Sequence, residues 1–138
     1  MAEWLGWYFS RRKKVLRHGD GRAIAVGVTH AVEGRPIPCE HGLHASTYVL
    51  QALDYAPGPV LWRVRLSGTI VDGGDKSCAT ERAYLAEIDA TPILKRFARQ
   101  CALKVAPLWD CPRIVRDYLE TGDESLRSAA RSAARLAA

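Results

Sequence analysis

Val60-Leu61-Trp62-Arg63-Val64-Arg65-Leu66 is the stretch that decides the fold. Every second side chain, counted from residue 60, is apolar, and Arg63 and Arg65 stand in the other set. This alternation is typical of a strand with one buried face and one solvent-exposed face. We therefore predict a strand over residues 60–66, with Trp62 in the core.

The chain after this strand holds a turn and one ambiguous segment. Gly68 before residues 69–71 indicates a bulge or a continuation of the strand, because glycine inside a strand often marks a bulge. Asp72-Gly73-Gly74-Asp75-Lys76 is a turn by composition. Residues 79–88 fit either a helix or a strand, and the sequence leaves both open.

The chain before the central strand also predicts strands. Residues 4–9 are rich in aromatic side chains and can form one. Gly19-Asp20-Gly21 separates the apolar runs 15–18 and 23–30, and an Asp-Gly turn between such runs predicts a hairpin. Residues 34–38 contain two prolines and therefore form a loop.

A helix is predicted between that loop and the central strand. Ser46 is a suitable N-cap for residues 47–56, and Pro57-Gly58-Pro59 ends the helix. Its apolar residues share one face: Val49, Leu50, Leu53 and Ala56.

From Thr91 the pattern becomes helical. Thr91 is a plausible N-cap, apolar residues recur at spacings of three and four, and Pro107 stops the helix. Pro112 opens a shorter helix, which Gly122 ends.

These elements predict an α+β fold: a small, mostly antiparallel sheet with one inserted helix, followed by two or three C-terminal helices. We expect one domain over residues 1–138, with a mixed strand and helix part at 1–90 and a helical part at 91–138. The predicted core consists of Trp62, Val64, Leu66, Leu50, Leu53, Phe97 and Leu94.

The composition of the chain bears on its cellular location and on the kind of partner it binds. No apolar run approaches the roughly 20 residues that cross a bilayer, so no membrane contact is expected. The four cysteines are widely spread, which favours reduced thiols and a cytoplasmic location. The net charge of +5 favours an acidic partner, with nucleic acid among the candidates.

Cys39, His41 and His44 are the candidate metal ligands. With a fourth ligand from His18, His30 or a remote cysteine they would complete a tetrahedral zinc site. Structural zinc sites usually show two pairs of closely spaced ligands, and only one cluster is present. We expect a thiol beside hydrogen-bonded imidazoles and no metal, and zinc is the alternative.

The segment Gly42-Leu43-His44-Ala45-Ser46, followed by a helix ending in Tyr55-Ala56 and then a strand, resembles the NAD-binding core of ADP-ribosyltransferases. The resemblance covers about a quarter of the chain. It implies a nicotinamide cleft with NAD as the cofactor. The implied roles are His18 or His44 on the ribose, Tyr55 near the ring, and Glu81 or Glu87 as the catalytic acid.

A longer signature covers most of the chain. Cys39-x-x-Gly42-Leu43-His44-Ala45-Ser46, Tyr55-Ala56-Pro57-Gly58 and Asp75-Lys76 resemble an uncharacterised family carried by phages, prophages and bacteria. The resemblance implies a mobile-element setting, in which small proteins bind and disable host machinery, including CRISPR effectors. We therefore expect an accessory, anti-CRISPR-like protein that binds a host protein or nucleoprotein complex, in the host cell cytoplasm if a phage encodes the chain. An ADP-ribosyltransferase-like enzyme is the alternative.

Basic segments are the candidate binding surface for such a partner. One is the run Arg11-Arg12-Lys13-Lys14, and the other is the last helix, which Asp123 or Ser125 caps. That helix is alanine-rich with an arginine at every fourth position, so little apolar bulk competes for its basic face. The predicted binding residues are Arg11, Arg12, Lys13, Lys14, Arg127, Arg131 and Arg135.

Overall fold

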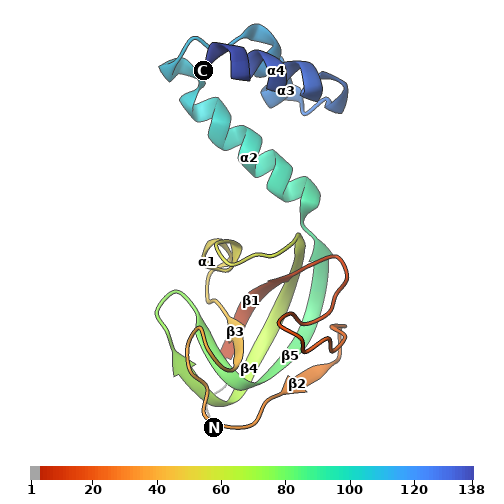
Figure 1. The fold of residues 1–138 in the computed structure, drawn as a ribbon, viewed down its shortest axis with the longest axis vertical. Helices are drawn as coiled ribbons and strands as arrows, with labels where there is room; N and C mark the ends of the chain where they lie inside the picture. The colour runs from red at the N-terminus through yellow and green to blue at the C-terminus, as the bar shows by residue number, and fades with distance from the viewer. Residues whose placement is uncertain (1–3) are drawn as a thin grey trace. The chain divides into compact units, whose positions relative to one another are not determined.

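The computed structural model describes residues 4–138 and divides into two compact units, which meet in the sequence at Ala90 and Thr91. The division falls where the sequence changes from mixed strands and helices to helices alone. The first unit holds a five-stranded sheet and the second holds helices (Figure 1). The α+β fold class predicted from the sequence is confirmed.

The sheet has the order β1-β4-β5-β2, and β3 also pairs with β5. All of these pairings are antiparallel. One edge of β5 pairs with β4, and the other edge pairs first with β3 and then with β2. The strands are β1 (Trp4–Ser10), β2 (Thr29–Ala31), β3 (Leu43–Ala45), β4 (Val60–Asp72) and β5 (Ser77–Asp89).

The long hairpin of β4 and β5 forms the centre of the first unit. The side chains of Trp62, Val64 and Leu66 are fully buried, as the alternating pattern predicts. The segment that fitted either helix or strand is β5. Gly68 lies at a register shift with φ of +74°, where an added Cβ would lie 2.1 Å from Thr80 Oγ1, and β4 continues past it to Asp72, so both a bulge and a continuation of the strand are present.

A short bridge joins β1 to the residue that follows β3. Trp7 and Ser46 exchange two backbone hydrogen bonds of 2.7 and 3.0 Å. Because β1 also pairs with β4, and β3 pairs with β5, this bridge closes the four strands into a ring. The closure brings the first strand next to the loop that carries the Gly-Leu-His-Ala-Ser motif.

The prediction that two strands form a hairpin over residues 15–30 is wrong. The chain does reverse, with a single bridge between Val15 and Ala23, but neither arm forms a strand before β2. The Leu16 N–H donates to the Arg22 carbonyl at 2.9 Å, so residues 17–21 form the turn, which is wider than a two-residue Asp-Gly hairpin loop.

The inserted helix is shorter than predicted. α1 spans Val49–Leu53 and its N-cap is Tyr48, not Ser46. Ser46 instead uses its backbone to bond β1, which prevents it from starting a helix. Leu50 was expected in the core but is 59% exposed, whereas Ala52 is the buried residue of the helix.

The second unit consists of helices connected by short turns. Gly122 ends α3 in the left-handed conformation, as predicted, and Asp123 accepts a hydrogen bond from Ser125 N at the start of the next turn. None of the helices in residues 4–138 is long and apolar enough to cross a membrane. The helices are α2 (Thr91–Val105), η1 (Ala106–Leu108), α3 (Arg113–Thr121), η2 (Glu124–Leu126) and α4 (Arg127–Ala137).

The predicted core contribution of α2 is wrong for Phe97, whose side chain is 45% exposed. Leu94 is partly buried, and α2 has no fully buried residue. The apolar spacing on α2 therefore predicted the helix but not the burial of its apolar face.

Candidate ligand-binding pocket

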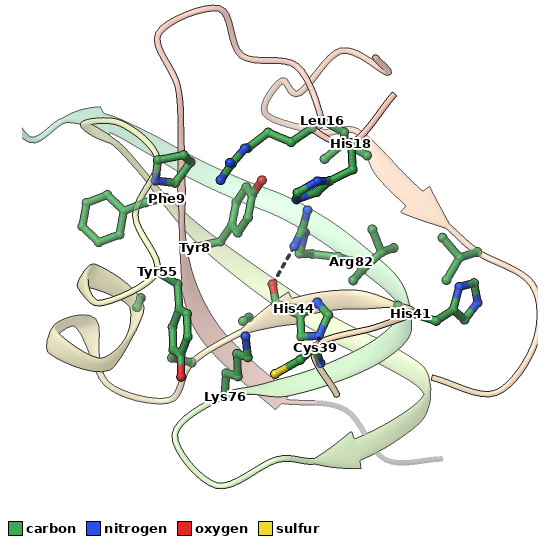
Figure 2. Close-up of a pocket in the computed structure, with 18 of the residues that line it drawn as sticks. Tyr8, Phe9, Leu16, His18, Cys39, His41, His44, Tyr55, Lys76 and Arg82 are labelled. Atoms are coloured by element: carbon green, nitrogen blue, oxygen red, sulfur yellow. Dashed lines mark hydrogen bonds between the residues drawn. The ribbon is translucent and has the colours of Figure 1, made fainter. Parts of the chain in front are cut away.

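A pocket of about 680 Å³ opens in the first unit, beside the ring of strands (Figure 2). Its walls come from β1, from the turn before β2, from the Gly-Leu-His-Ala-Ser segment and from β5. Aromatic side chains and cations share these walls. The lining includes Trp7, Tyr8, His18, Cys39, His44, Tyr55, Lys76 and Arg82.

His44 is positioned on β3 by glycine and by the backbone of Cys39. Gly42 has φ of +121°, and an added Cβ would lie 3.1 Å from Pro36 Cβ and 3.3 Å from Cys78 Cβ, so the chain passes closely there. The Cys39 N–H donates to His44 Nε2 at 3.1 Å. Burial, and then the charges of Lys76 and Arg82, lower the pKa of His44 to about 4. His44 is therefore a neutral imidazole at pH 7.

The low pKa of His44 predicts a pH dependence of stability. Between pH 6.5 and about 4 the unfolded chain binds a proton at His44 that the folded chain does not bind, so the free energy of unfolding falls as the pH falls through this window. Replacing His44 with Asn should reduce this slope in urea titrations at several pH values. His18→Asn is the control on an exposed residue, and an identical slope in both variants would contradict the assignment.

Tyr55, Asp75 and Lys76 form a second group at the pocket, although Tyr55 follows α1 and the other two lie in the β4–β5 turn. The Tyr55 hydroxyl donates to Asp75 Oδ2 at 2.5 Å, and Lys76 Nζ lies 3.9 Å from the Tyr55 ring centroid. The hydrogen bond to Asp75 raises the pKa of Tyr55 to about 12. The phenol therefore stays protonated and presents a fixed aromatic face.

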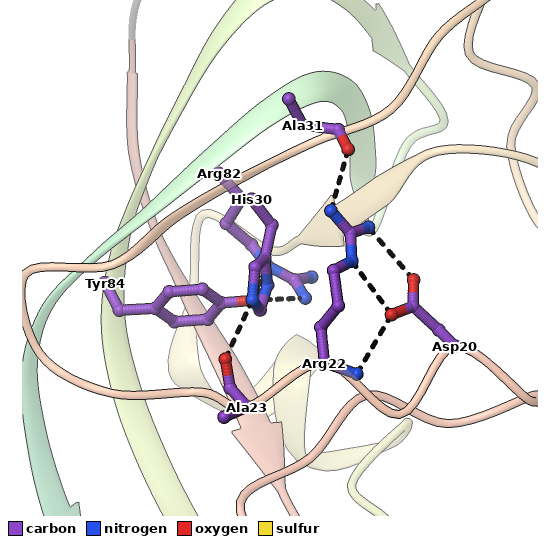
Figure 3. A network of polar contacts seen from close by, with 7 residues as sticks. All are labelled: Asp20, Arg22, Ala23, His30, Ala31, Arg82 and Tyr84. Atoms are coloured by element: carbon purple, nitrogen blue, oxygen red, sulfur yellow. Dashed lines mark hydrogen bonds and ion pairs between the residues drawn. The ribbon is translucent and has the colours of Figure 1, made fainter.

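Arg82 on β5 is the cation that sequence reasoning missed. It is only 2% exposed, although it lines the pocket. Its Nε and Nη2 atoms donate to the Tyr84 hydroxyl at 3.0 and 2.8 Å, and Nη1 donates to the His44 carbonyl (Figure 3 shows the contacts with Tyr84). Its guanidinium carbon lies 3.8 Å from the Tyr8 ring centroid. Arg82 lies opposite Leu66 on the buried face of the β4–β5 hairpin, and this pairing is what would have indicated its burial.

The structure brings together only part of the set implied by the transferase resemblance. His18, His44 and Tyr55 line the same pocket. Glu81 and Glu87 are not among its lining residues. Glu81 accepts a hydrogen bond from Ser67 Oγ at 2.9 Å, and Glu87 forms an ion pair with Lys14 at 2.8 Å.

The candidate metal ligands are engaged in other contacts. His41 Nε2 lies 2.6 Å from the Glu33 carbonyl oxygen, and His44 Nε2 accepts from the Cys39 backbone. Across residues 4–138, no group of three or more histidine, cysteine, aspartate or glutamate side chains is arranged to hold a metal ion.

The basic segments lie on the surface of both units. Arg11, Arg12 and Lys13 are exposed, and Lys14 is partly buried. Arg12 Nη1 lies 3.0 Å from Asp89 Oδ2, and Lys14 pairs with Glu87, so strand β5 neutralises part of this run. In the second unit the three arginines of α4 are all exposed: Arg127, Arg131 and Arg135.

Comparison with protein families places the pocket inside a recognised domain. Residues 16–96, more than half of the chain, match a family described as "Domain of unknown function (DUF7666)". The chain belongs to this family. No curated protein and no solved structure matches it.

The DUF7666 match includes most of the pocket and little of the second unit. It runs from Leu16, which lines the pocket, through Arg82 and ends early in α2. Cys39, His44, Tyr55 and Lys76 all lie within the match and at the pocket.

Proposed function

We propose that the DUF7666 unit of this chain binds a small molecule in the pocket, and that NAD is the first ligand to test. The observation that carries the proposal is the convergence of Cys39, His44, Tyr55 and Lys76 on one pocket. These residues come from three separate segments. If these residues served only to form turns or exposed loops, they would not need to line the same pocket.

The size and lining of the pocket suit a ligand with rings and charges. Its volume of about 680 Å³ falls within the range of roughly 300–1,000 Å³ that is usual for small-molecule sites. Trp7, Tyr8 and Tyr55 offer aromatic surface, and Lys76 and Arg82 offer positive charge. A dinucleotide has both features, and NAD is the one that the local resemblance to ADP-ribosyltransferases implies.

The positions of the glutamates favour binding over transfer. The acid of the implied transferase set would be Glu81 or Glu87, and both engage other residues outside the pocket lining. The carboxylates that do line it are Asp20 and Glu40, and Asp20 is bound by Arg22 at 2.8 Å. We therefore propose a binding domain, and we keep catalysis as an outcome to be measured.

Thermal unfolding with NAD tests this proposal. A ligand that binds only the folded chain stabilises it, by about 2.7 kcal/mol at a hundred times its Kd, so millimolar NAD should raise the Tm. Tyr55→Ala should remove the shift, because it deletes the aromatic face beside Lys76. Tyr48→Ala is the matched control on an exposed tyrosine that does not line the pocket.

No change of Tm in millimolar NAD would reject NAD as the ligand. A labelled product from labelled NAD in lysate would show catalysis and replace the binding proposal with the transferase alternative.

A second candidate function is binding of a host nucleoprotein complex through α4, in keeping with the resemblance to phage and prophage proteins. The specific observation is the exposure of Arg127, Arg131 and Arg135 on an eleven-residue helix whose only buried residue is Ala130. Guanidinium groups bind phosphates through paired hydrogen bonds.

Charge reversal tests this second candidate. Replacing the three arginines with glutamate should leave the helix folded and weaken binding to a nucleic-acid duplex by at least tenfold, because phosphate contacts dominate such affinities. Wild-type binding should also decline with added salt. Equal binding by the folded variant would show that α4 is not the binding surface.

A further inference from the structure

Arg82 is a buried cation whose partners are all neutral. Its guanidinium contacts the Tyr84 hydroxyl, the His44 carbonyl and the Tyr8 ring. Buried charges in proteins are usually paired with an opposite charge, because removal from water is costly. A negative charge on Tyr84 or on a nearby carboxylate would balance the charge of Arg82.

The hydrogen bonds around Tyr84 show that it carries none. Arg82 can only donate, so the Tyr84 oxygen accepts twice and must send its own proton to His30 Nδ1, 2.8 Å away. His30 then donates from Nε2 to the Ala23 carbonyl at 2.9 Å (Figure 3). Burial raises the pKa of Tyr84 and lowers that of His30. Both side chains are neutral, so the cluster keeps the full positive charge of Arg82.

No carboxylate within residues 4–138 forms an ion pair with Arg82. Asp20 lines the same pocket, but Arg22 holds both of its oxygens, at 2.8 and 2.9 Å. Lys76 adds a second cation to the pocket wall, and Figure 2 shows Lys76 and Arg82 on either side of His44. Glu40 is the other carboxylate of the lining, and among the described residues it forms no ion pair with Arg82 or Lys76, so both cations of the pocket lack a paired carboxylate.

The guanidinium of Arg82 has N–H groups that its hydrogen bonds within the protein do not use. It has five N–H groups, and three hydrogen bonds use one each on Nε, Nη1 and Nη2. One N–H remains on each terminal nitrogen. An anion that reached Arg82 would meet a cation already shielded from water, where electrostatic attraction is stronger than at an exposed site.

We infer that the pocket binds its ligand through an anionic group, a phosphate or a carboxylate, held by Arg82 together with Lys76. This inference rests on the proposed function only in taking the pocket as a ligand site. It names the part of the ligand that the protein recognises and does not depend on NAD.

Binding of inorganic pyrophosphate and of citrate, measured by calorimetry at constant ionic strength, tests the inference and separates phosphate from carboxylate ligands. At least one anion should bind the wild-type chain, and adenosine should bind at least tenfold more weakly. Lys76→Met should weaken anion binding about tenfold, the effect of losing one charged contact. Lys104→Met, on the exposed surface of α2, removes the same charge away from the pocket and should leave binding unchanged.

Arg82→Lys keeps the charge but removes the forked donor, and should also weaken binding, with circular dichroism used to verify its fold. Lys76→Met provides the same test if Arg82→Lys fails to fold.

Absence of anion binding by the wild-type chain, or equal binding by Lys76→Met and Lys104→Met, would overturn the inference. NAD binding that is unaffected by Lys76→Met would leave the pocket as a ligand site and overturn only its anionic recognition. Pyrophosphate binding without NAD binding would support anionic recognition in the pocket and reject only NAD as the ligand.

Discussion

Replacing Trp62 with Ala is expected to lower the free energy of unfolding of the sheet unit by about 3–5 kcal/mol, the usual cost of deleting a large buried aromatic side chain. Trp62 has no exposed surface, and its ring lies 5.4 Å from the Tyr84 ring centroid. Its Nε1 atom donates to Ser10 Oγ at 2.8 Å, so the variant also leaves that hydroxyl without its donor. Urea unfolding followed by circular dichroism measures the change.

The control for this prediction is Trp109→Ala, which removes an equal ring from a position that is 38% exposed. It should change the free energy of unfolding far less. An unchanged unfolding midpoint for Trp62→Ala would mean that the buried face of β4 is wrongly assigned.

The sequence predicted those parts of the fold whose signals are local. Alternation along residues 60–66 predicted the strand and its buried face, and Gly68 and Gly122 predicted a bulge and a helix end because both need positive φ. The hairpin over residues 15–30 forms only near its turn, at the Val15–Ala23 bridge, because the rest of its second arm finds hydrogen-bond partners in β5. Thr29–Ala31, for example, pairs with β5.

Long-range pairing also explains the shortened helix. Ser46 is a good N-cap by residue type, but its backbone is used by Trp7, which lies 39 positions earlier in the chain. The bridge joins two segments that are far apart in the chain, so the residues around Ser46 alone do not predict it. The same bridge positions β1 at the pocket wall, so the aromatic residues Trp7 and Tyr8 could not have been assigned to the site from sequence.

The candidate site was predictable in part, from the resemblances and from the close spacing of Cys39, His41 and His44, all of which line the pocket. Cys39, His44, Tyr55 and Lys76 were all part of quoted signatures, and they lie at the pocket. Arg82 carried no motif, and an arginine between Glu81 and Ala83 looks like an ordinary surface charge until its register with Leu66 is known.

Replacing Tyr84 with Phe is the second variant with a large expected effect, although it removes a single oxygen. That oxygen accepts from Arg82 Nε and Nη2 and donates to His30 Nδ1. Each buried polar group left without a partner costs about 1–3 kcal/mol, and a charged group costs more. Because Arg82 and His30 are both buried, we expect the free energy of unfolding to fall by about 3 kcal/mol or more.

Tyr8→Phe provides the matched comparison, since the Tyr8 ring contacts Arg82 through its face and Phe retains that face. It should cost much less than Tyr84→Phe in the same urea titration. Equal effects of the two variants would mean that the Tyr84 hydroxyl does not hold Arg82 in place. In that case the buried guanidinium would depend mainly on the Tyr8 ring, and only a variant such as Tyr8→Leu would release it.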